Sequence, residues 1–412
     1  MMSHGTRRLS SRADNDGDGE SGKKIEEVVD RGGNVKQVGD LTFVDGVLGK
    51  GSYGTVRLAK RQSRGGKTAV RDKQEDQVAV KIFHKSALKR IKTWESNGSN
   101  RQSRKLQIKT ALMKVEQEID IMKKLVHPNL VSLKEVILPE SDMIYMVLEY
   151  CKLGEILTFD EADGTFRRKG STIGMTIVNG HFDESTSALF FVDMLHGLAY
   201  LHSNHIAHRD IKPENILLSL TARGVPVAKL SDFGVAHMFD TNELSRIPHE
   251  DAALSPSEIV SKYAQRALSF GRDEPVGCLT KTEGTWCFWS PEMCSGDGAF
   301  SAYSADVWAA GVCLYIFVSG RLPFLCDVPV ELMQMIATTE APLDSLDISS
   351  SLMSLLKMIL TRDPRERAGV GECLSHEFLE QARAARMLHL DELSPAMEQN
   401  GFNIRVKITN NS

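Results

Sequence analysis

The sequence predicts an α+β protein with two lobes: a small antiparallel β-rich N-terminal lobe with one key helix, and a larger, mostly helical C-terminal lobe. Two observations predict this arrangement. Between Leu41 and about residue 150, short runs alternate apolar and polar residues, as strands do. Beyond about residue 152, apolar residues recur at helical spacing instead. A strand-rich part followed by a helix-rich part indicates two lobes with a cleft between them.

The N-terminal lobe is expected to open with a strand, a glycine turn and a second strand in LTFVDGVLGKGSYGTVRLAKR, residues 41–61. QVAVKIF, residues 77–83, is expected to form the next strand. A helix is expected over ALMKVEQEIDIMKKL, because Leu112, Val115, Ile119 and Met122 recur at helical spacing. LVSLKEVIL and MIYMVLEYC are predicted as two further strands.

The C-terminal lobe is expected to contain a helix over STSALFFVDMLHGLAYLHS, residues 185–203, with one buried face. Further helices are predicted around SADVWAAGVCLYIFVSG, PVELMQMIA and SLMSLLKMIL. The most apolar run, Ala309 to Val318, is too short to cross a bilayer, so a buried core helix is the better interpretation.

Residues 1–40 and 380–412 are predicted to be tails, and the first is expected to be disordered because it is polar and nearly free of aromatics. Two motifs in the N-terminal tail match the spelling of binding loops: GDGESG that of a phosphate-binding loop and DNDGDG that of a calcium-binding loop. The second has Ile25 where a calcium loop needs a bidentate Glu, so both are interpreted as solvated tail. Four polar insertions, residues 61–77, 93–110, 160–180 and about 236–282, are predicted to be surface loops.

Composition restricts the functional classes. The formal net charge of −4 gives no reason to expect a nucleic acid as the main partner. The seven cysteines include no C-x-x-C pair, so they are expected to be scattered thiols in a reducing compartment, not a zinc site. The N-terminus has no apolar signal-peptide stretch. A cytoplasmic location is expected, with the nucleus as an alternative, and no membrane partner.

The motif GKGSYGTVRLA, from Gly49 to Ala59, can be interpreted in two ways. Its glycines would let a hairpin close over phosphates with Val56 against a flat base, or they form a hairpin that binds nothing. Lys81, in VAVKIF, favours the first interpretation. An ammonium inside a lobe needs an anion, and Glu118 on the expected helix is the best candidate.

The block HIAHRDIKPENILL carries the strongest chemical signal. Asp210 could accept the proton of an incoming hydroxyl, Lys212 could neutralise a transferring phosphoryl group, and Asn215 offers an amide oxygen to a metal ion. His208 and Arg209 would support the loop. Asp232, in DFG, offers a carboxylate that could chelate Mg²⁺.

These motifs resemble those of the eukaryotic protein kinases, and the resemblance covers residues 41–379 (N-lobe 41–150, C-lobe 151–379). The matching pieces are GKGSYGTV, VAVK, the Glu118 helix followed by HPN, HRDIKPEN, DFG, SPE, DVWAAGV and RDPRERA. The resemblance implies ATP and Mg²⁺ as cofactors and protein substrates, and Lys212 with Gly284-Thr285 favours the serine/threonine class. A catalytically weak pseudokinase scaffold and a small-molecule phosphotransferase remain as alternatives.

The resemblance also assigns site residues. It implies a catalytic set of Lys81, Glu118, Asp210 and Lys212, with Asn215 and Asp232 as metal ligands. It implies a hinge with Leu148 as gatekeeper, a Glu292–Arg367 pair, and Asp306 bracing the catalytic loop. The implied nucleotide-binding residues are Leu48, Gly49, Lys50, Gly51, Ser52, Tyr53, Gly54, Val56, Ala79, Lys81, Leu148, Glu149, Cys151, Asn215, Leu217 and Asp232.

Within the class, the chain is most similar to calcium/calmodulin-dependent kinase kinases and related activators of AMP-activated-kinase homologues, so its substrate is expected to include another kinase. No strongly basic amphipathic helix follows Leu379, so direct calmodulin binding is not expected. The sequence departs from the family in SPE and in Trp286, which follows Gly284-Thr285 where Pro is usual. Phosphorylation candidates are RRLSS in the N-terminal tail and, in the activation segment, Ser255, Thr280 and Thr282, where a phosphate would pair with Arg209.

Overall fold

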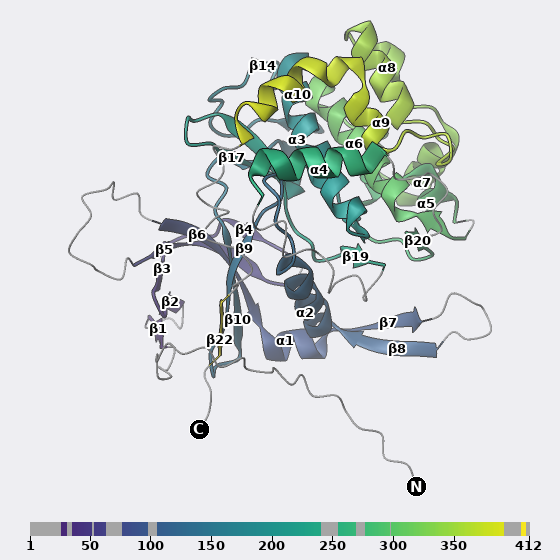
Figure 1. The fold of residues 1–412 in the computed structure, drawn as a ribbon. Coiled ribbons are helices and arrows are strands. Elements are labelled where there is room, and N and C mark those ends of the chain that lie inside the picture. Colours follow the sequence, from purple (N-terminus) through teal and green to yellow (C-terminus); the bar gives the residue numbers. More distant parts are fainter. Residues whose placement is uncertain are drawn as a thin grey trace.

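The computed structural model describes residues 26–30, 35–51, 53–62, 76–97, 105–239, 254–268, 277–296, 298–390 and 405–408. It has the predicted two lobes, a curled sheet below and a helical lobe above (Figure 1). Residues 1–25, with RRLSS, GDGESG and DNDGDG, lie outside the described residues.

The N-terminal lobe is built on one sheet, whose strands follow the order β1-β2-β3-β5-β6-β10-β9-β22, with β4 paired to β5. Every pairing in it is antiparallel except that of β22 with β9. The strands are β1 (Glu27–Val29), β2 (Val35–Val38), β3 (Leu41–Phe43), β4 (Gly49–Lys50), β5 (Thr55–Arg61), β6 (Asp76–His84), β9 (Leu133–Leu138), β10 (Met143–Glu149) and β22 (Arg405–Ile408).

Alternation along the central strands separates two cores. On β10, Tyr145 and Val147 are buried on one face with Leu41, whereas Ile144 and Met146 are buried on the other. The second face packs against the predicted helix, α2 (Ala111–Met122). Thr110 caps this helix, accepting a hydrogen bond from the Met113 amide. A short helix, α1 (Lys85–Arg90), that was not predicted lies beside it.

The C-terminal lobe packs around two long helices. All residues of α6 from Ala305 to Phe317 are buried, so this apolar helix forms the centre of the lobe. Among the described residues it is the one helix long and apolar enough to span a membrane, and it is mostly buried in protein. The helices are α3 (Glu184–Ser203), α4 (Pro256–Leu268), α5 (Pro291–Ser295), α6 (Ala302–Ser319), α7 (Pro329–Thr338), α8 (Ser350–Ile359), α9 (Val370–Ser375) and α10 (Glu380–Met387).

Short strand pairs position the loops between these helices. The pair that matters for the site is β17 with β18, since it joins the two motifs HRDIKPEN and DFG. The strands are β11 (Gly154–Glu155), β12 (Thr158–Asp160), β13 (Thr165–Arg167), β14 (Ile177–Val178), β15 (His181–Phe182), β16 (Ile206–Ala207), β17 (Ile216–Leu220), β18 (Pro226–Leu230), β19 (His237–Met238), β20 (Cys278–Leu279) and β21 (Phe300–Ser301).

Both predicted tails contain elements that pack on the lobes. Strands β1 and β2 extend the sheet before residue 41, and Val38 is fully buried in its core. Helix α10 docks on α3, where the buried Arg386 guanidinium lies 2.8 Å from the Asp193 carboxylate. Strand β22 adds to the opposite edge of the sheet. The described strands Glu27–Val29 and Val35–Val38, helix Glu380–Met387 and strand Arg405–Ile408 thus lie within the predicted tails and correct them there.

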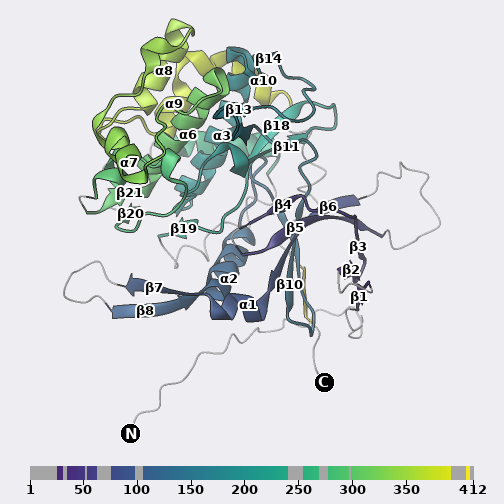
Figure 2. The same cartoon turned by 180° about the vertical axis from the view of Figure 1, so that it is seen from behind.

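Three of the predicted surface loops contain regular structure. In the second, β7 (Lys92–Asn97) pairs with β8 (Lys105–Thr110), and the two strands project from the lobe in both views (Figures 1 and 2). Residues 158–182 form two hairpins, β12–β13 and β14–β15. In the first loop, Arg61 ends β5, Asp76 and Gln77 begin β6, and residues 63–75 lie outside the described residues.

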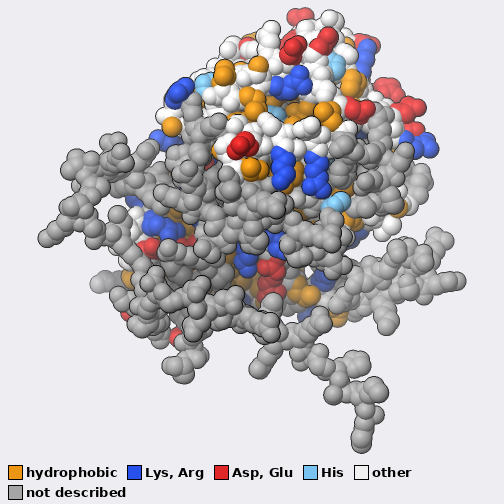
Figure 3. All heavy atoms as spheres, in the orientation of Figure 1, with side chains coloured by type: hydrophobic (Ala, Val, Ile, Leu, Met, Phe, Trp, Pro, Cys, Tyr) orange, Lys and Arg blue, Asp and Glu red, His pale blue; other side chains and the backbone are white. Residues whose placement is uncertain are grey.

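The last of these loops contains helix α4, which packs against α3 and α9. Tyr263 of α4 is fully buried, with its ring 4.6 Å from that of Tyr200 on α3. Because Ile259, Val260 and Tyr263 share one buried face, this stretch forms an amphipathic helix rather than a loop. Figure 3 shows that acidic, basic and hydrophobic side chains are interspersed on the visible face of the upper lobe.

Candidate active site

The glycine motif forms the predicted hairpin. Gly49 lies opposite Val56, and the Gly51 amide donates to the Gly54 carbonyl at 2.9 Å. A Cβ atom on Gly54 would lie 2.5 Å from the Ile82 carbonyl oxygen, so the turn requires glycine there. The other predicted residues of the motif, Leu48, Lys50 and Tyr53, lie along the same hairpin, and Ser52 lies outside the described residues.

Lys81 lies directly beside this hairpin, since β6 pairs with β5 so that Lys81 faces Val56. Its ammonium Nζ is 2.7 Å from Glu118 Oε1 and 3.0 Å from Asp232 Oδ1. Burial lowers the pKa of Lys81, but the two carboxylates outweigh burial and raise that pKa above its ordinary value. The predicted Lys81–Glu118 pair is therefore present, and it holds a charged ammonium that also reaches Asp232.

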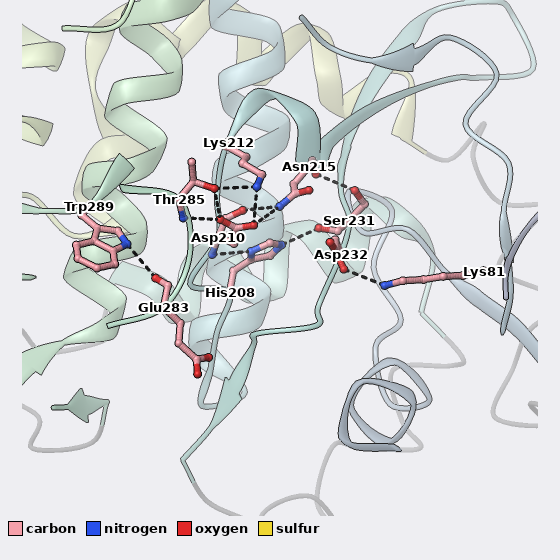
Figure 4. Close-up of polar contacts among 10 residues, drawn as sticks. All are labelled: Lys81, His208, Asp210, Lys212, Asn215, Ser231, Asp232, Glu283, Thr285 and Trp289. Atoms are coloured by element: carbon pink, nitrogen blue, oxygen red, sulfur yellow. Dashed lines mark hydrogen bonds and ion pairs between the residues drawn. The ribbon is translucent and has the colours of Figure 1, made fainter. Parts of the chain in front are cut away.

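Asp210 is held by a dense set of hydrogen bonds (Figure 4). Its Oδ1 accepts from the Thr285 amide and hydroxyl, both at 3.0 Å. Its Oδ2 lies 2.9 Å from the Lys212 ammonium and accepts from Asn215 Nδ2, also at 2.9 Å. These contacts fix the orientation of the carboxylate before any substrate binds.

Asp306 of α6 holds the backbone that precedes Asp210. The Asp306 carboxylate accepts from the amides of His208 and Arg209 at 2.8 and 2.7 Å, and it lies 3.0 Å from His202 Nε2. Arg209 has a φ of +70°, an unfavourable conformation for a side chain with a Cβ. The predicted bracing by Asp306 is thus present, and it stabilises a strained turn.

Asn215 and Asp232 meet at one end of the β17–β18 hairpin. The register places Ile216 opposite Leu230, and the Ser231 amide donates to the Asn215 carbonyl at 2.9 Å. Asn215 Nδ2 points at Asp210, so its amide oxygen, the atom that binds cations, points elsewhere. Burial raises the pKa of Asp232, but the Lys81 ammonium outweighs burial and lowers it. The pair therefore offers an ionised carboxylate and an amide oxygen.

A comparison with known proteins agrees with this geometry. A family model for the protein kinase domain matches residues 43–379. The chain belongs to the protein kinase family.

Curated relatives point to the same class. The kinase is 30% identical to a probable serine/threonine-protein kinase of Dictyostelium discoideum, covering 87% of this chain and 40% of that protein. It is 30% identical to serine/threonine-protein kinase TOS3 of Saccharomyces cerevisiae, covering 81% and 52%. It is 31% identical to serine/threonine-protein kinase GRIK1 of Arabidopsis thaliana, covering 81% and 65%. The chain thus spans from 40% to 65% of the length of these relatives.

The residues expected around the adenine of the kinase lie on neighbouring elements. Ala79 of β6 lies opposite Leu148 of β10, and Leu217 lies on β17 opposite Glu155. Cys151 is buried just beyond β10. The Glu149 carboxylate lies 3.0 Å from the buried Lys229 ammonium and accepts a hydrogen bond from the Ser132 hydroxyl, so the Glu149 backbone is the part that would meet a nucleotide.

The residues fit a magnesium nucleotide. The Asp232 side chain is 45% exposed and its carboxylate is charged, so its oxygens are accessible to a cation. Lys81 and Lys212 supply positive charge on either side for phosphate oxygens, as Figure 4 shows. Asn215 and Asp232 would hold the metal ion.

The end of the activation segment packs on the catalytic loop. Thr285 accepts a hydrogen bond from Lys212 at 2.8 Å, and further on Glu292 forms a bidentate pair with the fully buried Arg367 at 2.8 and 2.9 Å. The predicted Glu292–Arg367 pair is therefore present. Trp286, the unusual residue, is 46% exposed and lies directly after Thr285.

One charged residue of this segment, Glu283, is not predicted from the sequence to have a role in the site. Its carboxylate contacts Arg209, the residue that was expected to bind a phosphate. The sequence offers one sign of this residue, an acidic side chain directly before Gly284-Thr285. A single acidic residue belongs to no periodic pattern, so its role is seen only once its cationic partners are known.

Proposed function

We propose that this chain is a serine/threonine protein kinase that transfers the γ-phosphoryl group of ATP to Ser or Thr hydroxyls of protein substrates. The observation that carries the proposal is the convergence of Lys81, Asp210 and Asp232. Lys81 contacts Asp232 directly, and the hairpin ends that carry Asp210, Asn215 and Asp232 are hydrogen-bonded together.

Each residue has a role in this reaction. Lys81 binds the α and β phosphates, held in place by Glu118. Asp210 orients the substrate hydroxyl and takes its proton as the oxygen bonds to the γ-phosphorus and the bond to the β-phosphate oxygen breaks. Lys212 neutralises charge on the transferring group. Asn215 and Asp232 would hold a magnesium ion, which would supply positive charge for the phosphates of the nucleotide.

The test is phosphate transfer from labelled ATP to a generic Ser/Thr protein substrate by the purified chain. We expect transfer that is lost in Lys81→Met and Asp232→Asn. A pseudokinase scaffold would show nucleotide binding without transfer, and a small-molecule phosphotransferase would consume ATP without labelling protein. Either result would contradict the proposal.

We also propose that the substrate is the activation loop of another kinase, as in the calcium/calmodulin-dependent kinase kinase group. Support comes from the sequence of α2 and its continuation, VEQEIDIMKKLVHPNLVSLKEVI, from the insertion before α2, and from GVCLYIFVSGRLPFLCD at the end of α6. The kinase would phosphorylate an AMP-activated-kinase-like activation loop faster than generic peptides. Equal rates would remove this grouping and leave the kinase activity intact.

The domain limits and location are proposals too. We propose a kinase domain over residues 41–379, in line with the family match to residues 43–379. We propose a cytoplasmic location, because all seven cysteines are unpaired thiols. Imaging of a fluorescent fusion tests the location, and exclusion from the cytoplasm would contradict it.

A further inference from the structure

Glu283 lies among three cationic side chains that come from three different elements. Its carboxylate is 2.7 Å from Lys281 Nζ, 3.3 Å from Arg209 Nη1 and 3.5 Å from Lys114 Nζ. The side chains of Glu283, Arg209 and Lys114 are 17%, 10% and 16% exposed. A partly buried carboxylate with three cationic partners interacts much more strongly than an exposed surface pair.

Each cation connects Glu283 to a different part of the catalytic machinery. Lys114 lies on α2 one turn before Glu118. The same helix is therefore held by Glu283 through Lys114 and by Lys81 through Glu118. Arg209 directly precedes Asp210 and also donates to the Lys281 carbonyl at 2.9 Å. Glu283 thus joins α2, the catalytic loop and the activation segment.

The residues after Glu283 carry this anchoring to Asp210. Gly284 has a φ of +94°, and a Cβ there would lie 2.4 Å from the Arg209 carbonyl oxygen, so the segment turns closely against the catalytic loop. Thr285 then binds Asp210 and Lys212. Trp289 Nε1 donates to the Glu283 carbonyl at 3.1 Å and closes the turn from the other side.

The charge of Glu283 is maintained at neutral pH. Burial raises the pKa of Glu283, but the hydrogen bond from Lys281 and the charges of Arg209 and Lys114 outweigh burial and lower that pKa below its ordinary 4.5. Glu283 therefore places a negative charge among the three cationic side chains of Lys114, Arg209 and Lys281.

We propose that Glu283 is a positioning residue whose carboxylate holds the activation segment in its catalytic arrangement, so that no phosphate on Thr280 or Thr282 is required. The inference rests on the proposed kinase function. A phosphate brings about −1.5 to −2 charge and would seek the same Arg209, which already has an anionic partner here. Phosphorylation would therefore replace a contact instead of creating one.

The experiment compares the chain without substitutions (the unmodified chain), before and after phosphatase treatment, with four phosphatase-treated variants: Thr280→Ala/Thr282→Ala, Glu283→Gln, Glu283→Asp and Glu340→Gln. Glu340 is a matched control, because it is a 76% exposed carboxylate paired with Arg362. We expect the unmodified chain, the double alanine variant and the control to keep the same kcat. Glu283→Gln should lose about tenfold to a hundredfold in kcat, with a smaller change in the KM for ATP, and Glu283→Asp should recover part of the loss.

Amide hydrogen exchange provides a readout independent of catalysis. Exchange over residues 277–290 should quicken in Glu283→Gln and stay unchanged in Glu340→Gln, with melting temperatures showing whether each variant is folded. The inference is overturned if phosphatase or the double alanine change abolishes activity, or if Glu283→Gln keeps both the kcat and the exchange of the unmodified chain. If the unmodified chain transfers no phosphate at all, the proposed function fails, and the exchange comparison still decides whether Glu283 orders the segment.

Discussion

The two aspartates that we propose to be catalytic, Asp210 and Asp232, have contrasting environments. Asp210 is 14% exposed and accepts hydrogen bonds from Thr285 and Asn215 beside the Lys212 ammonium. Asp232 is 45% exposed, and Lys81 approaches one of its oxygens. The difference indicates two tasks. A carboxylate that must aim at a hydroxyl is oriented by its neighbours in advance, whereas one that must bind a cation keeps oxygens accessible.

The largest expected loss of activity comes from changing Asp232, the more exposed of the two aspartates. Asp232→Asn removes the charge that would bind the metal ion, and we expect kcat/KM to fall by about 10⁴-fold, because metal neutralisation is worth several kcal/mol. Transfer assays at several Mg²⁺ concentrations measure it. Asp120→Asn is the matched control, since Asp120 is a 69% exposed carboxylate beside Lys123. Near-normal turnover of Asp232→Asn would contradict the assignment.

The second largest loss of activity is expected from changing Asp210, the aspartate that its neighbours hold in a fixed orientation. Asp210→Asn preserves an oxygen for the Thr285 hydrogen bonds but removes the proton acceptor, so kcat should fall by about 10³-fold. Binding of a magnesium nucleotide analogue should remain near normal, because Asp232 and Lys81 are untouched. If Asp210→Asn abolished nucleotide binding as well, the separation of the two tasks would be wrong.

A subtler change tests whether orientation itself matters. Thr285→Val removes the hydroxyl between Asp210 and Lys212 while keeping the shape of the side chain. We expect about a tenfold loss in kcat, as for a hydrogen bond to a charged group, and Thr285→Ser should retain most of the activity. Equal activity in the two variants would show that the hydroxyl does not orient Asp210.

The smallest expected effect is a pH dependence. In the unmodified chain Lys81 lowers the pKa of Asp232 below its ordinary 3.8, so its carboxylate stays ionised at every pH above that value. In Lys81→Met burial still raises the pKa of Asp232, and only the weaker lowering effects of His208 and the Gly234 amide oppose it. The affinity of the variant for a magnesium nucleotide analogue should therefore fall by up to about tenfold between pH 7 and pH 5, beyond any change in the unmodified chain. Parallel pH profiles of the two proteins, measured by calorimetry, would contradict this.

The parts that the sequence predicts correctly depend on local patterns. Alternation predicts β5, β6 and β10, helical spacing predicts α2, and the apolar run Ala309–Val318 predicts α6. The need of an internal lysine for an anion predicts the Lys81–Glu118 pair, and the resemblance to protein kinases implies the Glu292–Arg367 pair. The strands and helices are specified by residues a few positions apart, and each residue pair joins two motifs that are recognised separately in the sequence.

The parts that were missed depend on partners distant in the chain. The parallel pairing of β22 with β9 has no local signature, because it joins the C-terminal segment to a strand of the other lobe. Helix α4 lies in a polar stretch, and its single strip of Ile259, Val260 and Tyr263 is buried only because α3 offers Tyr200. Glu283 is a lone acid whose role appears only with Lys114 and Arg209 in place.

Docking of α4 on the C-terminal lobe also has a consequence for chain entropy. The cost of closing a flexible loop rises only with the logarithm of its length, and a fixed point inside a long connection divides it into two independent closures. With Tyr263 buried against α3, helix α4 supplies such a fixed point in the connection between the DFG motif and Thr285. The length of the insertion is therefore largely decoupled from the order of its final turn at Thr285, so added residues before α4 should leave that turn undisturbed.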